Sequence, residues 1–127
     1  MRYLAGKKLR LKNTRDISRM FRTGLRARDA RLTLIASPRD AGEDIRSRMA
    51  AAVSGKHGNA VARNRVKRLC REAFRTNRDR LPEGWDFVML PRPDANHTMK
   101  QLADSLRALS AKIVKKSGNA METRNDS

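Results

Sequence analysis

The fold follows from residues 54–75, which read Ser-Gly-Lys-His-Gly-Asn-Ala-Val-Ala-Arg-Asn-Arg-Val-Lys-Arg-Leu-Cys-Arg-Glu-Ala-Phe-Arg. The two glycines bound a tight turn, and after it we predict a long helix over about residues 60–78. At about 100° per residue, the apolar side chains of this helix share roughly one third of its circumference. They are Ala62, Val66, Leu69, Cys70 and Ala73, with Phe74 at the edge. This side of the helix is expected to pack on the protein interior.

The opposite side of the same helix is cationic. It carries Asn64, Lys67, Arg68, Arg71 and Arg75, and it is flanked by Arg63 and Arg65. The row spans roughly 16 Å at 1.5 Å per residue, which is long enough to touch several phosphates. A salt-bridged surface helix would need acidic residues three or four positions from these cations. Glu72 is the only acidic residue between positions 55 and 78, so the pattern favours nucleic-acid contact over a solvated helix face.

Strands are predicted on both sides of this helix. Residues 48–54 form one strand, with small side chains suited to packing under a helix, and residues 85–90 form the clearest strand of the chain. Residues 31–37 alternate well enough for a third strand. The acidic, turn-rich segment 38–46 is then expected to be an exposed hairpin loop. Because strands precede and follow the basic helix, we expect that helix to lie in a β-α-β crossover.

Two further helices complete the expected fold. A short helix is predicted from Thr14, which caps it, to Gly24, which ends it. A last helix begins after Thr98, which opens a capping box, and carries an apolar stripe from Met99 to Ile113. The resulting order α-β-β-α-β-α predicts an α+β fold, a single-domain sandwich in which helices cover a small mixed sheet.

Positive charge dominates the composition. The chain has 30 Lys and Arg against 13 Asp and Glu, a formal net charge of +17. Self-repulsion at this charge costs stability, and neutralising phosphates releases their counterions, so nucleic acid is the expected partner. We assign residues 1–12 to a basic arm, 13–117 to one RNA-binding domain and 118–127 to a disordered tail.

Other functional classes find little support. Cys70 is the only cysteine, which excludes an internal disulfide, and no secretory signal or long apolar run is present. We therefore expect a cytoplasmic protein without membrane association. His57 and His97 are far apart in the sequence and have no companions at ligand spacing, so we expect no metal bound by the protein. The acidic residues are scattered, which argues against a self-contained nuclease with carboxylates around catalytic metals.

The central motif resembles a known family. The run Gly-Asn-Ala-Val-Ala-Arg-Asn-Arg-Val-Lys-Arg at residues 58–68, followed by Arg-Glu-Ala-Phe at 71–74, is similar to the signature of the bacterial ribonuclease P protein component. Residues 10–24 resemble the first helix of that family, and residues 86–92 resemble its last strand. The resemblance extends over about residues 9–115.

The resemblance implies a function. Proteins of this family assemble with a large catalytic RNA, and the particle removes the 5′ leader from precursor tRNA by endonucleolytic phosphodiester hydrolysis. The RNA holds Mg²⁺ and performs the chemistry, so no catalytic residue and no catalysis by the protein alone are expected. The implied partners are the catalytic RNA and precursor tRNA, and no protein partner is predicted. Charge alone leaves open the alternative of a structural, rRNA-binding ribosomal or ribosome-assembly protein.

The resemblance also implies two sets of contacts. The residues expected to bind the catalytic RNA are Lys56, Asn59, Arg63, Asn64, Arg65, Lys67, Arg68, Arg71 and Arg75. The 5′ leader is expected in a cleft beside the sheet and the first helix, lined by Ile17, Phe21 and Ile35. Family members often have aromatic residues at the positions of Ile17 and Ile35, so leader contact here would depend more on cations and aliphatic packing. Phe21 can equally be a core residue.

Overall fold

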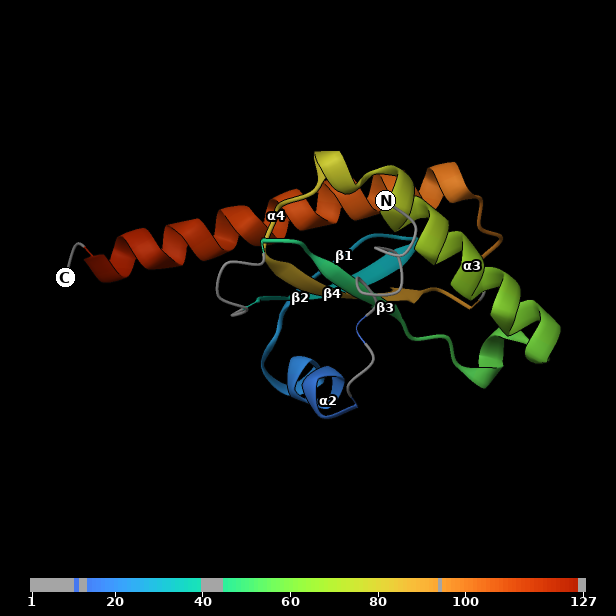
Figure 1. Cartoon of the computed structure of the whole chain (residues 1–127). Helices are drawn as coiled ribbons and strands as arrows, with labels where there is room; N and C mark the ends of the chain where they lie inside the picture. The colour runs from blue at the N-terminus through green and yellow to red at the C-terminus, as the bar shows by residue number, and fades with distance from the viewer. Residues whose placement is uncertain (1–10, 12–13, 40–44, 94, 126–127) are drawn as a thin grey trace.

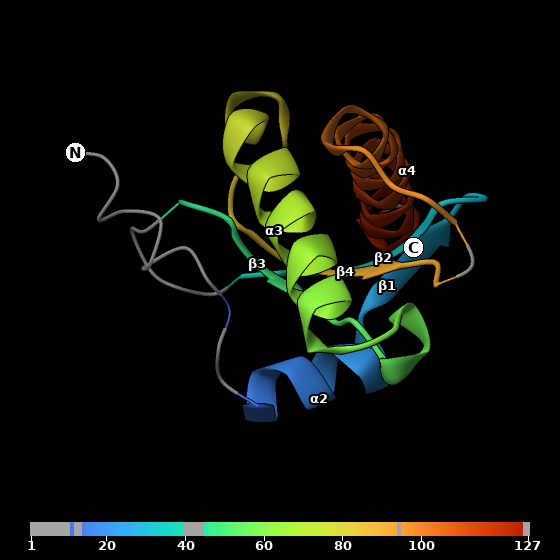
Figure 2. The same cartoon turned by 90° about the vertical axis from the view of Figure 1, so that its right-hand side faces the viewer.

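The computed structural model describes Leu11 and residues 14–39, 45–93 and 95–125, with the backbone alone for 119–125. Its elements follow one another as α2 (Thr14–Thr23), β1 (Leu25–Arg28), β2 (Leu32–Pro38), β3 (Arg48–Ala51), the 3₁₀ turn η1 (Gly55–His57), α3 (Ala60–Thr76), the 3₁₀ turn η2 (Arg78–Arg80), β4 (Trp85–Pro91) and α4 (Met99–Asn125). Helices α3 and α4 cover one face of the sheet and α2 covers the other (Figures 1 and 2). The predicted α+β sandwich is confirmed.

The sheet has the strand order β1-β2-β4-β3. Strands β1 and β2 are antiparallel, as are β2 and β4, whereas β3 runs parallel to β4. A parallel pair needs a long crossover connection, and α3 lies within the connection between these two strands. The sheet is therefore mixed, and the basic helix occupies the expected β-α-β crossover.

Two features of the sheet differ from the prediction. Strand β1, with the sequence Leu-Arg-Ala-Arg, was not predicted, because four residues with two small or apolar positions give only a weak signal. Strands β2 and β3, which precede and follow segment 38–46, do not form the expected hairpin, because β4 lies between them and pairs with both. The acidic residues of this segment, Asp40, Glu43 and Asp44, lie outside the described part of the chain.

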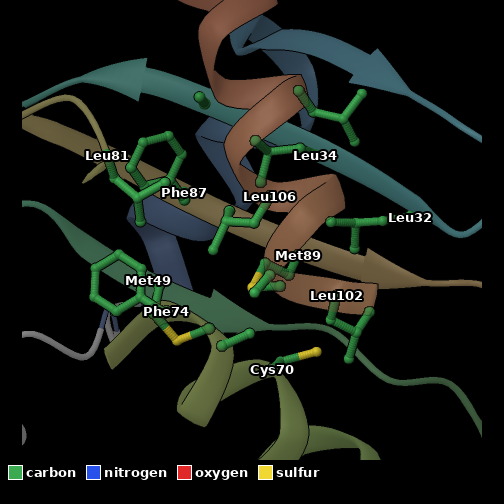
Figure 3. Close-up of a cluster of buried hydrophobic side chains, with 14 of the residues drawn as sticks. Leu32, Leu34, Met49, Cys70, Phe74, Leu81, Phe87, Met89, Leu102 and Leu106 are labelled. Carbon is green, nitrogen blue, oxygen red and sulfur yellow. The ribbon is translucent and has the colours of Figure 1, made fainter. Parts of the chain in front are cut away.

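The main core lies between the sheet and the two helices α3 and α4 (Figure 3). Alternation along β2 sends Leu32, Leu34 and Ala36 to this side, where they meet residues such as Phe87 and Leu106. All five are fully buried. This core fixes α3 against the sheet along one side, which determines the side that faces outward.

A smaller cluster fills the space between the sheet and α2. Met20 from α2 packs there with Ile35 and Val88, which point to the opposite side of the sheet from the main core. Leu11 joins the same cluster, and its N–H donates to the carbonyl oxygen of Met49 on β3 at 2.8 Å. Leu11 therefore belongs to the folded domain, although residues 1–12 were predicted to be a basic arm; the other residues of that range lie outside the described part of the chain.

The predicted ends of the helices are shifted in two places. Helix α3 ends at Thr76, two residues before the predicted end, and Asn77 follows as its C-cap. Helix α4 begins after Thr98, whose hydroxyl accepts a hydrogen bond from the N–H of Gln101 at 3.2 Å, as predicted. It continues to Asn125, through residues expected to form a disordered tail, and extends past the edge of the sheet (Figure 1). Once formed, a helix gains one hydrogen bond per added residue without tertiary contacts.

Candidate nucleic-acid interface

The turn that leads into α3 is held by local hydrogen bonds. The hydroxyl of Ser54 accepts from the N–H of Lys56 at 3.3 Å, and Gly58 has a φ of 117° that favours glycine. The side-chain oxygen of Asn59 accepts from the N–H of Ala62 at 2.9 Å, so Asn59 is the N-cap of α3. Asn59 was predicted to contact RNA, and its capping role was not predicted, although asparagine before a helical run signals it.

The inner side of α3 is fixed by packing. Cys70, Ala73 and Phe74 are buried in the main core, and Val66 and Leu69 pack against it, as the periodicity predicted. Burial raises the pKa of the Cys70 thiol to about 12, so this cysteine stays neutral and unreactive. Rotation of α3 about its axis would expose these core residues to water. The fold therefore fixes which side of α3 faces outward.

The outer side of α3 presents polar and cationic groups to solvent. We call Asn64, Arg65, Lys67 and Arg68 the α3 cationic surface. Asn64, Arg65 and Arg68 are exposed, and Lys67 is half-buried. Within the described residues, no hydrogen bond or ion pair engages the side chains of these four residues. Their cations are available to an external anion.

Three arginines predicted for the same role are in different environments. Arg75 forms an ion pair with Glu72, with an Nη2–Oε1 distance of 2.7 Å, and this hydrogen-bonded partner lowers the pKa of the Glu72 carboxyl. Arg71 is half-buried and already has an interaction partner. Arg63 is half-buried, and its Nε is buried without a hydrogen-bond partner among the described residues. Within α3, the freely available part of the predicted RNA-binding set is therefore the α3 cationic surface.

A hollow opens on the α2 side of the sheet, beside the turn that precedes α3. We call it the β-face hollow. It is lined by Arg28, Thr33, Ala52, Ser54, Lys56, His57, Leu90, Pro91, Arg92 and Pro93. Three of these residues are cationic, and the described lining contains no carboxylate. Lys56 borders this hollow, so the structure places it apart from the outward row on α3.

Two histidines that are far apart in the sequence meet next to the β-face hollow. The ring centroids of His57 and His97 are 6.3 Å apart. Nε2 of His57 donates to the carbonyl oxygen of Pro91 at 3.0 Å, and Nε2 of His97 donates to that of Arg92 at 2.7 Å. A carbonyl oxygen can only accept, so each Nε2 carries the proton. Both rings hold the end of β4 in place.

The three residues predicted to contact the leader are not equivalent. Ile35 is fully buried under α2 and cannot line an open cleft, because α2 covers this part of the sheet. Ile17 is half-buried against the same small cluster. Phe21 is 37% exposed, and the Arg26 guanidinium lies 6.0 Å from its ring centroid. Of the three, Phe21 is the most exposed.

Comparisons with known proteins identify the family. The family model described as Ribonuclease P matches residues 5–125, which is most of the chain. The chain belongs to the ribonuclease P protein family. Its curated relatives include the ribonuclease P protein component of Petrotoga mobilis, 36% identical over 111 residues, which cover 87% of this chain and 92% of the relative. That of Exiguobacterium sibiricum is 34% identical over 113 residues, or 88% of this chain and 92% of the relative.

Solved ribonuclease P proteins share the fold. A Staphylococcus aureus RNase P protein mutant with defective mRNA degradation activity superposes with a TM-score of 0.71 and 29% identity, over 88% of this chain and 92% of that chain. The RNase P protein from Thermotoga maritima gives a TM-score of 0.66 and 25% identity, over 78% of this chain and 96% of that chain. The family therefore accounts for the mixed sheet and for the helix in its crossover.

Within the described residues, no group of three or more His, Cys, Asp or Glu side chains could hold a metal ion. None of the helices described is both long enough and apolar enough to cross a membrane.

Proposed function

We propose that this chain is the protein subunit of a bacterial ribonuclease P, which removes the 5′ leader from precursor tRNA by hydrolysing one phosphodiester bond. A catalytic RNA performs the chemistry and holds the Mg²⁺ ions, and the protein binds that RNA and the leader. Membership of the ribonuclease P family supports this function. The observation that carries it is the α3 cationic surface, whose side chains have no partner within the described chain although the other side of the helix is packed.

The α3 cationic surface suits a folded RNA for electrostatic reasons. Arginine presents a planar fork of donors that matches phosphate oxygens, and Arg65 and Arg68 both face solvent. Each neutralised phosphate releases condensed counterions, which makes the association favourable and dependent on salt. The packed inner side of α3 fixes the helix backbone, so only the exposed side chains must become ordered when the RNA binds.

For the 5′ leader we propose a route along the β-face hollow. Arg26 and Arg28 are two residues apart on β1 and therefore point to the same side of the sheet. Arg26 contacts the ring of Phe21, and Arg28 borders the hollow together with Lys56. A single strand can stack one base on Phe21 and place its phosphates along these cations. This route replaces the cleft expected over Ile35.

The division of labour follows from these assignments. The protein contributes binding and orientation: it holds the leader beside the catalytic RNA, so that cleavage proceeds within one assembled particle. Lys56 and His57 of η1 line the β-face hollow, and η1 leads into α3 (Figure 2), so we propose that the two RNA surfaces adjoin. We further propose that the particle is cytoplasmic, where precursor tRNA is processed in bacteria.

Reconstitution tests the function directly. The protein is mixed with a bacterial ribonuclease P RNA at low Mg²⁺, and removal of the 5′ leader from precursor tRNA is measured. The mixture should cleave, whereas the protein alone should not. Cleavage by the purified protein without RNA would contradict the proposed division of labour.

A pair of matched variants tests the interface. Replacing both Arg65 and Arg68 with alanine should weaken RNA binding and reduce the slope of log K against log salt by about one unit per lost phosphate contact. The control replaces Lys115 and Lys116, two exposed cations on α4, and removes the same charge. Equal losses in the two double variants would show that overall charge, rather than the α3 cationic surface, drives binding.

The leader route has its own test. Replacing Arg28 and Lys56 with alanine should weaken binding of precursor tRNA with a long leader and leave binding of mature tRNA unchanged. An equal loss for both RNAs would exclude the β-face hollow as the leader site.

A further inference from the structure

Val61 is an apolar residue on the outside of the molecule. It is the second residue of α3, and its side chain is 78% exposed. This is the largest exposure among the large hydrophobic side chains of the described residues; Ile45 follows at 59%. Isolated exposed apolar residues are common on protein surfaces, so the position of Val61 decides whether it has a role.

Val61 lies at the beginning of the α3 cationic surface. Residues three, four and seven positions further along a helix share one side with the first. For Val61 these are Asn64, Arg65 and Arg68, all of which are exposed. The packed side of α3 is formed by other residues, such as Val66 and Cys70. Val61 therefore belongs to the surface that the proposed function gives to RNA.

The folded chain gives no reason for a valine at this position. Valine is a poorer helix former than alanine, and its neighbours Ala60 and Ala62 show that alanine is accommodated in the same turn. Nothing in the described chain buries the two methyl groups of Val61. An alanine would form the helix better and would leave less apolar surface in water.

We propose that the methyl groups of Val61 pack against a ribose of the RNA that occupies the α3 cationic surface. This inference rests on the proposed function and adds an apolar contact to it. RNA is the occupant that the charges favour, because Arg65 and Arg68 beside Val61 would repel a second copy of this basic chain. The shallow minor groove of an RNA helix displays its riboses, whose carbon-bound hydrogens form an apolar edge. One side chain can reach such an edge while its cationic neighbours bind the adjoining phosphates.

The proposed contact of Val61 should respond to salt differently from the contacts of the neighbouring arginines. Arginine contacts displace counterions, so their loss changes the slope of log K against log salt. A methyl–ribose contact displaces water instead, so its loss lowers the affinity by the same factor at every salt concentration. This difference separates the role of Val61 from that of Arg65 in one measurement.

The test measures binding of the full-length protein to a bacterial ribonuclease P RNA across a salt series. Val61→Ala should weaken binding about threefold to tenfold, with an unchanged salt slope. Ile45→Ala, the matched control at the other highly exposed aliphatic residue, should leave binding unchanged, and Arg65→Ala should reduce the slope. Alanine favours the helix, so the Val61 variant is expected to fold, and circular dichroism verifies this.

Each other outcome has a definite meaning. Full affinity of Val61→Ala, together with a reduced slope for Arg65→Ala, would overturn the ribose contact and leave the proposed function intact. Unchanged binding in both variants would remove α3 from the interface, and the proposed function would lose its main support. Self-association of the free protein that disappears in Val61→Ala, measured by sedimentation, would assign this residue to a protein contact and also overturn the inference.

Discussion

Arg48 and Asp86 form a bidentate ion pair across the parallel strands β3 and β4. Nε and Nη2 of Arg48 each lie 2.8 Å from one carboxylate oxygen of Asp86. The two residues are also direct partners in the register of these strands. Their side chains are 23% and 8% exposed, so the pair is largely shielded from water. It links β3 to β4 at the N-terminal end of β3, whereas the crossover starts from the C-terminal end.

Asp86→Asn should therefore destabilise the fold. The change leaves the Arg48 guanidinium partly buried beside a neutral group, and we expect a loss of about 2–3 kcal/mol in the free energy of unfolding, less than for a fully buried pair. Urea denaturation at neutral pH measures it. The double variant Arg48→Met with Asp86→Leu should recover much of the loss, since two apolar groups need no partner. A loss below about 0.5 kcal/mol in Asp86→Asn would show that the pair is not coupled to folding.

Gly24 is required by close packing between α2 and β2. A Cβ added there would lie 2.6 Å from Cγ2 of Ile35 and 2.7 Å from the carbonyl oxygen of Met20. Gly24→Ala should lower the free energy of unfolding by about 1–3 kcal/mol, because the backbone of α2 must move. Gly55→Ala is the control: nothing lies within 4 Å of its added Cβ, and its φ is not positive. Thermal melting should show a clear loss for the first variant alone; equal melting temperatures would contradict the predicted clash.

Glu72 is the acidic residue of α3. Its carboxylate pairs with Arg75, and the lowered pKa keeps it ionised well below neutral pH. Glu72→Gln should strengthen RNA binding severalfold at low salt, because a negative charge next to the phosphates is removed, and the gain should shrink as salt screens it. Asp104→Asn on α4 is the matched control, since Asp104 also pairs with neighbouring cations. A similar gain in both variants would point to net charge alone.

Cys70 should make the fold sensitive to alkaline pH. Its pKa rises from 9.0 to about 12 on burial. Between these values the unfolded chain loses the thiol proton while the folded chain keeps it, so stability falls as pH rises above about 9. In this range the free energy of unfolding of the native chain should fall relative to that of Cys70→Ala, by up to about 1.4 kcal/mol per pH unit. A constant difference between pH 8 and pH 11 would show that the thiol ionises equally in both states.

The helices were accessible from sequence because their signals are local. The 3.6-residue pattern of α3 and the cap at Thr98 each depend on residues within one or two turns, and both were predicted. Strand pairing depends on residues far apart in the sequence. The prediction of a hairpin at 38–46 was therefore wrong, since nothing local indicates that β4 inserts between β2 and β3.

For the site too, local features were predictable from the sequence and contacts between distant residues were not. The availability of Arg65 and Arg68 was predictable from the shortage of nearby acidic residues. Arg75 differs because it pairs with Glu72, three positions before it in the same helix. The burial of Ile35 depends on where α2 packs, which its alternating neighbours do not reveal. The β-face hollow combines residues from β1, β2 and β4 with η1, so only the strand order brings Arg28 and Lys56 together.

Leu11 lies against the outer edge of the sheet, at β3. Strand β3 is terminal in the strand order, and an open strand edge is a template on which other chains can add. The bond from Leu11 to Met49 and the burial of the Leu11 side chain occupy that edge. A chain shortened to begin at residue 10 should keep this contact, whereas one that begins at residue 14 should lose it and expose the edge of β3 to aggregation.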